Sequence, residues 1–355
     1  MSLTIALGGD TMLGRGVAKA LAERPATDAW SPELRAIFAE ADVAVVNLEC
    51  CISEGGEPWN PGRKPFHFRA PPRAVEALTA IGVRAVWLAN NHALDFGQKA
   101  LLDTLDHLAA AGITVVGAGR DVAEARAGRV VEVGEARIGL VAFADHPAEF
   151  AAGPDTPGIA WADISDGAPT WLADQVRRLS RSCDIVVGGA HWGPNMRASP
   201  PRQHRTVAGD LVGAGLGALA GHSAHIVQGI ERLDGAPICY DLGDLLDDYA
   251  VDPLLRNDLG VVALLHPGER LELVPLRLEF ARTTLARGQD HAAIVERIIA
   301  ASRVFGTDLR REGDRLILDL DDTAPGPYGP ASDPGTRFRH TIPDALHPWP
   351  QPDSS

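Results

Sequence analysis

The chain has 355 residues, 45% of them hydrophobic and 23% charged, a composition typical of a soluble globular protein with one large or two ordinary domains. Its formal net charge of −14 and the lack of any basic run argue against a nucleic-acid partner, because phosphate binding needs concentrated Lys and Arg. No signal-peptide pattern and no long apolar stretch is present, so we expect a cytoplasmic protein with no membrane partner.

The first part of the chain alternates between strand-like and helix-like segments. Apolar runs at 3–9, 43–49, 83–90 and 113–119 predict buried strands, and the segments at roughly 31–41, 71–81 and 97–111 predict helices. The helix at 71–81 starts with Pro and ends before Gly, and these residues are preferred at helix starts and ends. This alternation predicts an α/β domain.

From residue 129 onward the pattern is richer in hairpins. Residues 129–145 predict an antiparallel hairpin, and a helix at 168–181, a strand at 184–193 and a helix at 202–215 follow. The later segments 226–235, 236–244, 259–268 and 270–280 predict further strands, then a helix at 289–303 and a strand at 315–320. We therefore expect two mixed sheets that face each other, with helices outside.

These segments predict one domain over residues 1–322. Its motif-bearing core spans about 3–265, and 266–322 complete it with strands and a helix. The remainder, 323–355, is rich in Pro, Gly and Asp and predicts an extended tail.

Side chains that can bind metal ions stand just past several of the apolar runs. Loops at strand ends are where α/β folds place their chemistry, so these side chains predict one divalent-metal centre. A mixture of carboxylate, amide and imidazole donors suits Mn, Fe or Zn better than Mg or Ca. The predicted ligands are Asp10, Glu49, Asn91, His191, His222 and His225.

Each of these residues also has a structural interpretation. Asp10 can cap the next helix, Asn91 can serve a turn, and His191 beside Trp192 can be a packed core histidine. In the acidic run at 241–248, Asp244 can support the metal site from behind its ligands, but a solvated loop is the preferred interpretation. The four cysteines show no CxxC spacing and are expected to be reduced.

The motifs also resemble those of a known family when they are taken in order. GD-x-ML-GR, NLE, NNH-x-x-D-x-G, HWG and GHSAH with Y-D-x-GD resemble the CapA-type family, named for bacterial poly-γ-glutamate capsule biosynthesis and similar to the calcineurin-like metallophosphoesterases. The resemblance covers roughly residues 3–265. It implies a mixed α/β, four-layer αββα sandwich with a two-metal site in the loops at one edge.

The resemblance assigns roles to the matching positions. It implies that His92 hydrogen-bonds or protonates the substrate oxygen, that Asp95 orients His92, and that Glu49 stands where the superfamily has a metal-bridging Asp. It implies metal-ligand roles for the remaining predicted ligands. Met12 departs from the superfamily, which opens with D-x-H, and the terminal motif is H-x-x-H rather than H-x-H. The first metal position can therefore be weak, empty or filled by another residue. Whether the centre holds one ion or two is left open.

A second group of side chains predicts a site for an anionic substrate. Cationic side chains in a Gly/Pro-rich loop, and one in the first turn of a helix, can meet a phosphate or carboxylate. Plain surface charge is the alternative for the loop. The predicted substrate-binding residues are Arg15, Lys64, His67 and Arg69.

The leading functional prediction is a metal-dependent hydrolase, most simply a phosphoesterase that uses water activated at a mono- or binuclear centre. An amidase or amide-bond-forming accessory protein for γ-glutamyl or peptide-like substrates is the first alternative. A non-catalytic partner in a biosynthetic system is the second. The oligomeric state is left open.

Overall fold

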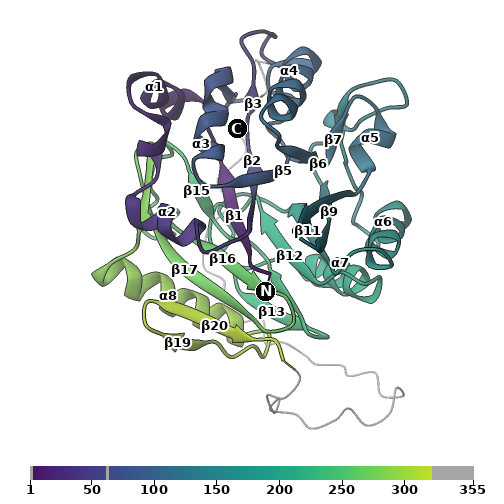
Figure 1. Ribbon diagram of the computed structural model, residues 1–355. Coiled ribbons are helices and arrows are strands. Elements are labelled where there is room, and N and C mark those ends of the chain that lie inside the picture. Colours follow the sequence, from purple (N-terminus) through teal and green to yellow (C-terminus); the bar gives the residue numbers. More distant parts are fainter. Residues whose placement is uncertain (1–2, 61–63, 322–355) are drawn as a thin grey trace, which may run out of the picture. The chain divides into compact units, whose positions relative to one another are not determined.

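The computed structural model describes residues 3–60 and 64–321, and within them two β-sheets lie face to face. Figure 1 shows the two sheets with helices around them. The larger sheet has a parallel centre, in which β1, β2, β5 and β6 run side by side. Strands at such a centre are covered on both faces, which explains why every residue of β2 is buried. In order across the sheet the strands are β19 (Arg310–Glu312), β20 (Arg315–Asp319), β17 (Arg270–Glu279), β16 (Leu259–His266), β1 (Ile5–Thr11), β2 (Val43–Leu48), β5 (Val83–Trp87) and β6 (Thr114–Val116), with β15 (Asp244–Leu246) on β1 and β18 (Arg282–Leu285) on β17.

The second sheet also has parallel strands at its centre, and its two faces pack differently. Along β9, Leu140 and Ala142 point into the interior between the sheets, whereas Val141 and Phe143 point toward the outer helices. Its strands, in order, are β13 (Ile230–Leu233), β14 (Ala236–Cys239), β12 (Ala218–His222), β11 (Ile185–His191), β9 (Ala136–Ala144) and β8 (Arg129–Val133). Two short pairs accompany the sheets: β3 (Cys51–Ile52) with β4 (Arg69–Ala70), and β7 (Ala118–Gly119) with β10 (Gly158–Ile159).

The helices form the outer layers. Buried Leu172, Val176 and Leu179 recur at helical spacing on α6 and pack with α7 on the outer face of the second sheet. Helix α2 starts where Ser31 accepts a hydrogen bond from the Leu34 N–H at 3.2 Å. The helices are α1 (Arg15–Glu23), α2 (Pro32–Phe38), α3 (Val75–Thr79), α4 (Gly97–Ala110), α5 (Val122–Arg126), α6 (Thr170–Ser180), α7 (Arg202–Gly213) and α8 (Gly288–Arg303). This arrangement confirms the predicted four-layer mixed α/β sandwich.

One predicted strand is wrong, and the error bears on the site. The sequence pattern predicts a continuous strand at 236–244, but β14 ends at Cys239 and β15 begins at Asp244 in the other sheet. The chain turns at Gly243, whose φ of 70° is accessible to glycine at little cost. Asp244 thereby lies beside Asp10 in a parallel register.

The structure bears on three predictions about the chain as a whole. All four cysteines lie in the described residues and are free, as expected. No helix of residues 3–60 and 64–321 has the length and apolar character needed to cross a membrane. Met1–Asp321 forms one compact unit, while the predicted tail at 323–355 lies outside the described residues, so the domain limits stay a prediction.

Candidate metal centre

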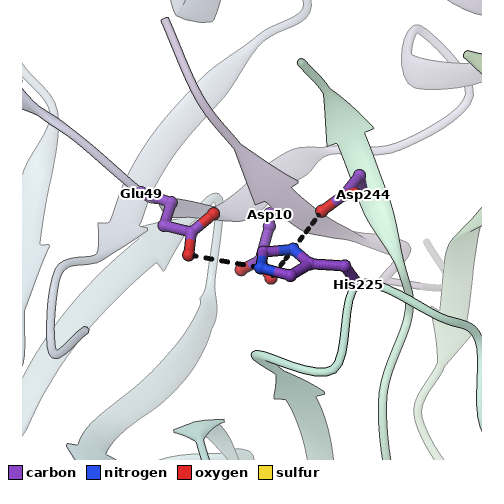
Figure 2. Close-up of side chains that lie close together, drawn as sticks. All are labelled: Asp10, Glu49, His225 and Asp244. Carbon is purple, nitrogen blue, oxygen red and sulfur yellow. Dashed lines mark hydrogen bonds and ion pairs between the residues drawn. The ribbon is translucent and has the colours of Figure 1, made fainter. Parts of the chain in front are cut away.

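Four buried side chains from four separate segments meet at the carboxyl ends of the central strands. Asp10 lies near the end of β1, Glu49 follows β2, His225 lies beyond β12, and Asp244 begins β15. One potential ligand atom from each lies within 4.8 Å of the others. Figure 2 shows the His225 ring between the carboxylates. This cluster is the strongest candidate for a metal site among the described residues.

The imidazole of His225 lies close to all three carboxylates of this cluster. Its Nδ1 lies 2.7 Å from Asp244 Oδ1 and 3.4 Å from Asp10 Oδ2, and its Nε2 lies 3.8 Å from Glu49 Oε1. Burial alone lowers the pKa of His225, but the three facing carboxylates raise it well above its usual value. Without a metal ion, His225 therefore acts as the countercharge to these carboxylates, and a cation that binds here would replace its proton.

Neighbouring polar groups fix the position of Asp10. Asn47 Nδ2 donates to Asp10 Oδ1 at 2.5 Å, and the Ser223 N–H donates to Asp10 Oδ2 at 3.1 Å. Asn47 lies opposite Asp10 in the β1–β2 register, and Asn90 Nδ2 approaches Asn47 Oδ1 at 3.3 Å. These contacts hold the Asp10 carboxylate toward the cluster.

A second set of potential ligand atoms lies beside the first. His222 Nε2 lies 3.3 Å from the Gly8 carbonyl, which fixes the ring and leaves Nδ1 available. His191 Nδ1 lies 3.8 Å from Asp10 Oδ1, which connects the second set to the first. Asn91 lies in the loop after β5, and its Oδ1 is buried without a hydrogen-bond partner.

Several of these atoms are buried without a hydrogen-bond partner in the described structure. Buried polar atoms are nearly always paired, so a group of unpaired ones in a single place points to a missing partner. The unpaired atoms are Glu49 Oε1, Asn91 Oδ1, His191 Nε2, His222 Nδ1 and Asp244 Oδ2. Carboxylate, amide and imidazole donors fit a divalent cation.

The electrostatics of the cluster fit a cation too. Burial raises the pKa of Glu49 well above its usual value, and the nearby Asp10 carboxylate adds to this shift. Burial lowers the pKa of His191 and of His222, which keeps both imidazoles neutral, the form that binds metals. A bound cation would offset the carboxylate repulsion without competing with protons on these two rings.

The acidic run at 241–248 is not a solvated loop, so the preferred sequence interpretation is wrong. Asp241, Asp244 and Asp247 are 1%, 0% and 6% exposed. Asp241 accepts from the N–H groups of Ala224 and Gly243, both at 2.7 Å, and so fixes the loop that carries His225. The run is buried because the chain crosses between the sheets here.

Met12 does not contribute a ligand and is part of the core. It is fully buried, and its Sδ accepts from the Gly14 N–H at 3.0 Å. Asp244 supplies a donor beside Asp10 from a different strand.

His92 lies at the rim of the cluster, held by Asp95. His92 Nδ1 is 2.5 Å from Asp95 Oδ2, and its Nε2 is 3.9 Å from Glu49 Oε1. Its ring stacks on Phe68 with the centroids 3.9 Å apart. Burial lowers the pKa of His92 to about 4. The ring is thus oriented, neutral near pH 7, and directed toward Glu49.

The four predicted substrate-binding residues are placed differently from one another. Lys64 Nζ lies 2.7 Å from Asp95 Oδ1 and also donates to the Asn91 carbonyl, so it braces the loop of His92. Arg69 donates to the Gly55 carbonyl at 3.0 Å, and His67 Nε2 lies 2.7 Å from the Trp59 carbonyl. Both stabilise the loop before β4.

Arg15 is the one of the four that stays open to solvent near the cluster. Its side chain is 36% exposed, its Nη2 lies 2.9 Å from Asp248 Oδ1, and its guanidinium lies over the Phe68 ring at 5.3 Å and the Tyr249 ring at 5.7 Å. Tyr249 donates from its hydroxyl to Glu49 Oε2 at 3.2 Å. Nothing in the sequence patterns singled out Tyr249. The substrate-binding roles stay predictions.

Two facing sheets with helices outside form the calcineurin-like four-layer sandwich that the sequence resemblance implies. The buried carboxylate–imidazole cluster lies at the carboxyl ends of the central strands. Residues 4–249 match the family described as bacterial capsule synthesis protein PGA_cap. The chain therefore belongs to this CapA-type family.

Two curated relatives illustrate the family. A probable polyglutamine synthesis accessory protein of Mycobacterium tuberculosis is 34% identical, over 89% of this chain and 95% of that protein. The PGA biosynthesis protein CapA of Bacillus subtilis is 29% identical, over 69% of this chain and 63% of that protein.

Solved structures with similar folds are more distant. A hypothetical protein from Thermus thermophilus has a TM-score of 0.43 at 17% identity, covering 79% of this chain and 96% of that one. A purple acid phosphatase from yellow lupin has a TM-score of 0.35 at 9% identity, covering 82% of this chain and 55% of that one.

Proposed function

We propose that this protein is a metal-dependent hydrolase that cleaves a phosphoester at a centre of two divalent cations. The observation that carries the proposal is the group of buried, unpaired ligand atoms from both sheets beside a cluster with excess negative charge. Each unpaired buried group costs roughly 1–3 kcal/mol, so several such atoms close to a cluster of carboxylates support a missing cation.

The donors divide into two neighbouring sets. One cation would be held by the cluster of Asp10, Glu49, His225 and Asp244. A second would be held by Asn91, His191 and His222. Bound divalent ions of this kind supply a low-pKa water nucleophile and polarise the phosphoryl oxygens.

His92 is arranged to move a proton at Nε2. Its Nδ1–H faces the Asp95 carboxylate, so the neutral ring has its lone pair on Nε2, directed toward Glu49. It can accept a proton there, and Asp95 stabilises the imidazolium that forms. The same proton can then pass to the leaving oxygen. Lys64 holds the other oxygen of Asp95 and thereby fixes the pair.

Arg15 gives the site its preference for anions. Its guanidinium pairs with Asp248 and lies over the rings of Phe68 and Tyr249. The Tyr249 hydroxyl in turn donates to Glu49. A guanidinium held in this way can pair with a phosphate or carboxylate of the substrate.

Amide hydrolysis or amide-bond formation is a second candidate, and the names of the relatives favour it. One relative is described as a polyglutamine synthesis accessory protein and another as a PGA biosynthesis protein. The His92–Asp95 pair could also transfer a proton to or from an amide substrate, and Arg15 could pair with a carboxylate of that substrate.

Metal analysis followed by a substrate panel tests the proposal. Protein purified without chelator or metal resin should hold close to two equivalents of Mn, Fe or Zn, and chelation should abolish hydrolysis of phosphoesters until Mn²⁺ is restored. The double variant Glu49→Ala, His222→Ala should be inactive, and Asp174→Asn on the exposed face of α6 should behave as wild type. Hydrolysis of γ-glutamyl peptides alone would favour the second candidate, and full activity of the double variant would rule out both.

A further inference from the structure

A second histidine–aspartate pair, His146 and Asp145, lies beside His191, one of the proposed metal ligands. Asp145 and His146 follow β9, the strand next to β11 in the second sheet. In the β9–β11 register Ala144 lies opposite His191, so the chain reaches His146 two residues past the level of a proposed ligand. The rings of His146 and His191 are 5.5 Å apart. His146 therefore borders the centre on the side of the second set of donors.

Both carboxylate oxygens and both backbone polar groups of Asp145 have a hydrogen-bond partner. Its Oδ1 pairs with His146 Nδ1, its Oδ2 accepts from the Gly193 N–H at 3.0 Å, and its carbonyl accepts from Trp161 Nε1 at 3.0 Å. Its own N–H donates to the His191 carbonyl at 3.2 Å. The orientation of the His146 ring is thus fixed through Asp145 to the strand end that carries His191.

His146 itself is open on its other side. Its side chain is 36% exposed, whereas that of His191 is 1% exposed. No described residue bonds to its Nε2, while Nδ1 is occupied by Asp145. An imidazole that is held at one nitrogen and free at the other, next to a buried cluster of ligand atoms, is arranged to meet a molecule that enters from solvent.

We propose that His146 is a substrate-positioning residue, which hydrogen-bonds through Nε2 to a polar atom of an anionic phosphoester bound at the second set of donors. This inference rests on the proposed function. His92–Asp95 from the first sheet and His146–Asp145 from the second then flank the bound phosphoryl group.

Phosphate binding by calorimetry, on Mn²⁺-loaded protein, tests this role apart from catalysis. His146→Ala should raise the Kd for inorganic phosphate about tenfold, as expected for the loss of one hydrogen bond to a charged group, with the Mn²⁺ content unchanged. His146→Gln should recover part of the affinity, and Asp145→Asn should lose part of it. On an aryl phosphate ester, His146→Ala should raise KM more than it lowers kcat. His291→Ala on α8 is the matched control and should change nothing.

The possible results separate the two proposals. Equal phosphate affinity of wild type and His146→Ala would overturn the role of His146 and leave the hydrolase proposal intact. Loss of one Mn²⁺ equivalent in His146→Ala would also overturn it, because His146 would then be a ligand. Wild-type protein that holds Mn²⁺ but binds no phosphate and hydrolyses no phosphoester would overturn both.

Discussion

Asp244 shows how one side chain can change the interpretation of the whole site. It is fully buried, adjacent to Asp10 in register, and within hydrogen-bond distance of His225. Met12 occupies the position where the superfamily motif has a histidine, and it is packed in the core. In the proposed function, a carboxylate from β15 therefore takes the place of the donor that is missing from β1.

Replacing Asp244 with Asn tests this compensation. Asp244→Asn keeps the size of the side chain but removes its charge, so we expect the cluster with Asp10 to lose its ion, while the neighbouring donors keep theirs. Elemental analysis should show close to one metal equivalent per chain, or an affinity for the first ion weakened about 10–100-fold. The exposed Asp174→Asn on α6 serves as the control. Two tightly held ions in Asp244→Asn would show that Asp244 is not a ligand.

His204 gives a pH prediction that does not depend on metal. It is 3% exposed and stacks on Trp192 with ring centroids 4.1 Å apart, and burial lowers its pKa from 6.5 to about 4. The unfolded chain takes up this proton as the pH falls through 6.5, and the folded chain only near 4. Acid therefore favours unfolding over this window, and stability rises with pH across it.

The variant His204→Phe should weaken this pH dependence, because it keeps an aromatic ring against Trp192 but cannot titrate. Between about pH 6.5 and about pH 5 the wild type should lose roughly 2 kcal/mol more stability than the variant. Urea unfolding at several pH values measures this difference. Parallel stability curves for the two proteins would show that folding does not lower the pKa of His204.

At the scale of elements, the chain crosses from the second sheet to the first between β14 and β15, and this crossing places Asp244 beside Asp10. Gly9 in β1 packs so closely on this crossing that a Cβ there would lie 1.8 Å from the Gly243 carbonyl oxygen. That carbonyl accepts from the Asp10 N–H at 3.1 Å. The GG before Asp10 is thus required by the approach of the crossing strand.

Gly9→Ala should therefore disturb both stability and the site. The added methyl group cannot be accommodated against backbone, so we expect a loss of at least about 3 kcal/mol or failure to accumulate folded protein. Gly209→Ala is the matched control, since nothing lies within 4 Å of a Cβ at this position in α7. It should stabilise the helix by about 0.5–1 kcal/mol. Equal urea midpoints for the two variants would contradict the close approach.

The same crossing marks where sequence reasoning reached its limit. Asp10, Glu49 and His191 could be predicted as neighbours because each follows a short apolar run, and parallel strands end at a common edge. For Asp244, support of the metal site was only the less favoured interpretation, since APICYDLGD has the pattern of one strand and the conformation of Gly243 divides it between two sheets. The contact of Lys64 with Asp95 was equally hidden, because a cation in a polar loop gives no sign of a buried partner.

At the scale of the whole molecule, the net charge of −14 is partly concentrated inside the fold. Asp10, Glu49, Asp241, Asp244 and Asp247 are all buried near one another at the edge of the two sheets. Burial raises the pKa of Asp241 and of Asp247 well above the usual value for a carboxyl, a sign that their charges are costly without a counterion. In the proposed function, these buried carboxylates lower the stability of the metal-free fold and provide affinity for cations.

This trade-off predicts opposite effects of one substitution in the presence and absence of metal. Bound metal should stabilise the wild type by roughly 2.7 kcal/mol at a free concentration 100 times Kd, and more above it. Glu49→Gln removes a repelled charge, so its metal-free form should be at least as stable as the metal-free wild type, but its stability should no longer rise on adding Mn²⁺. Thermal unfolding of both proteins, with chelator and with a Mn²⁺ titration, measures the two effects, and Asp174→Asn should follow the wild type in each. A metal-free Glu49→Gln protein that is clearly less stable than metal-free wild type would mean that the carboxylates support the fold by themselves, and the cluster would lose its best reason to be a cation site.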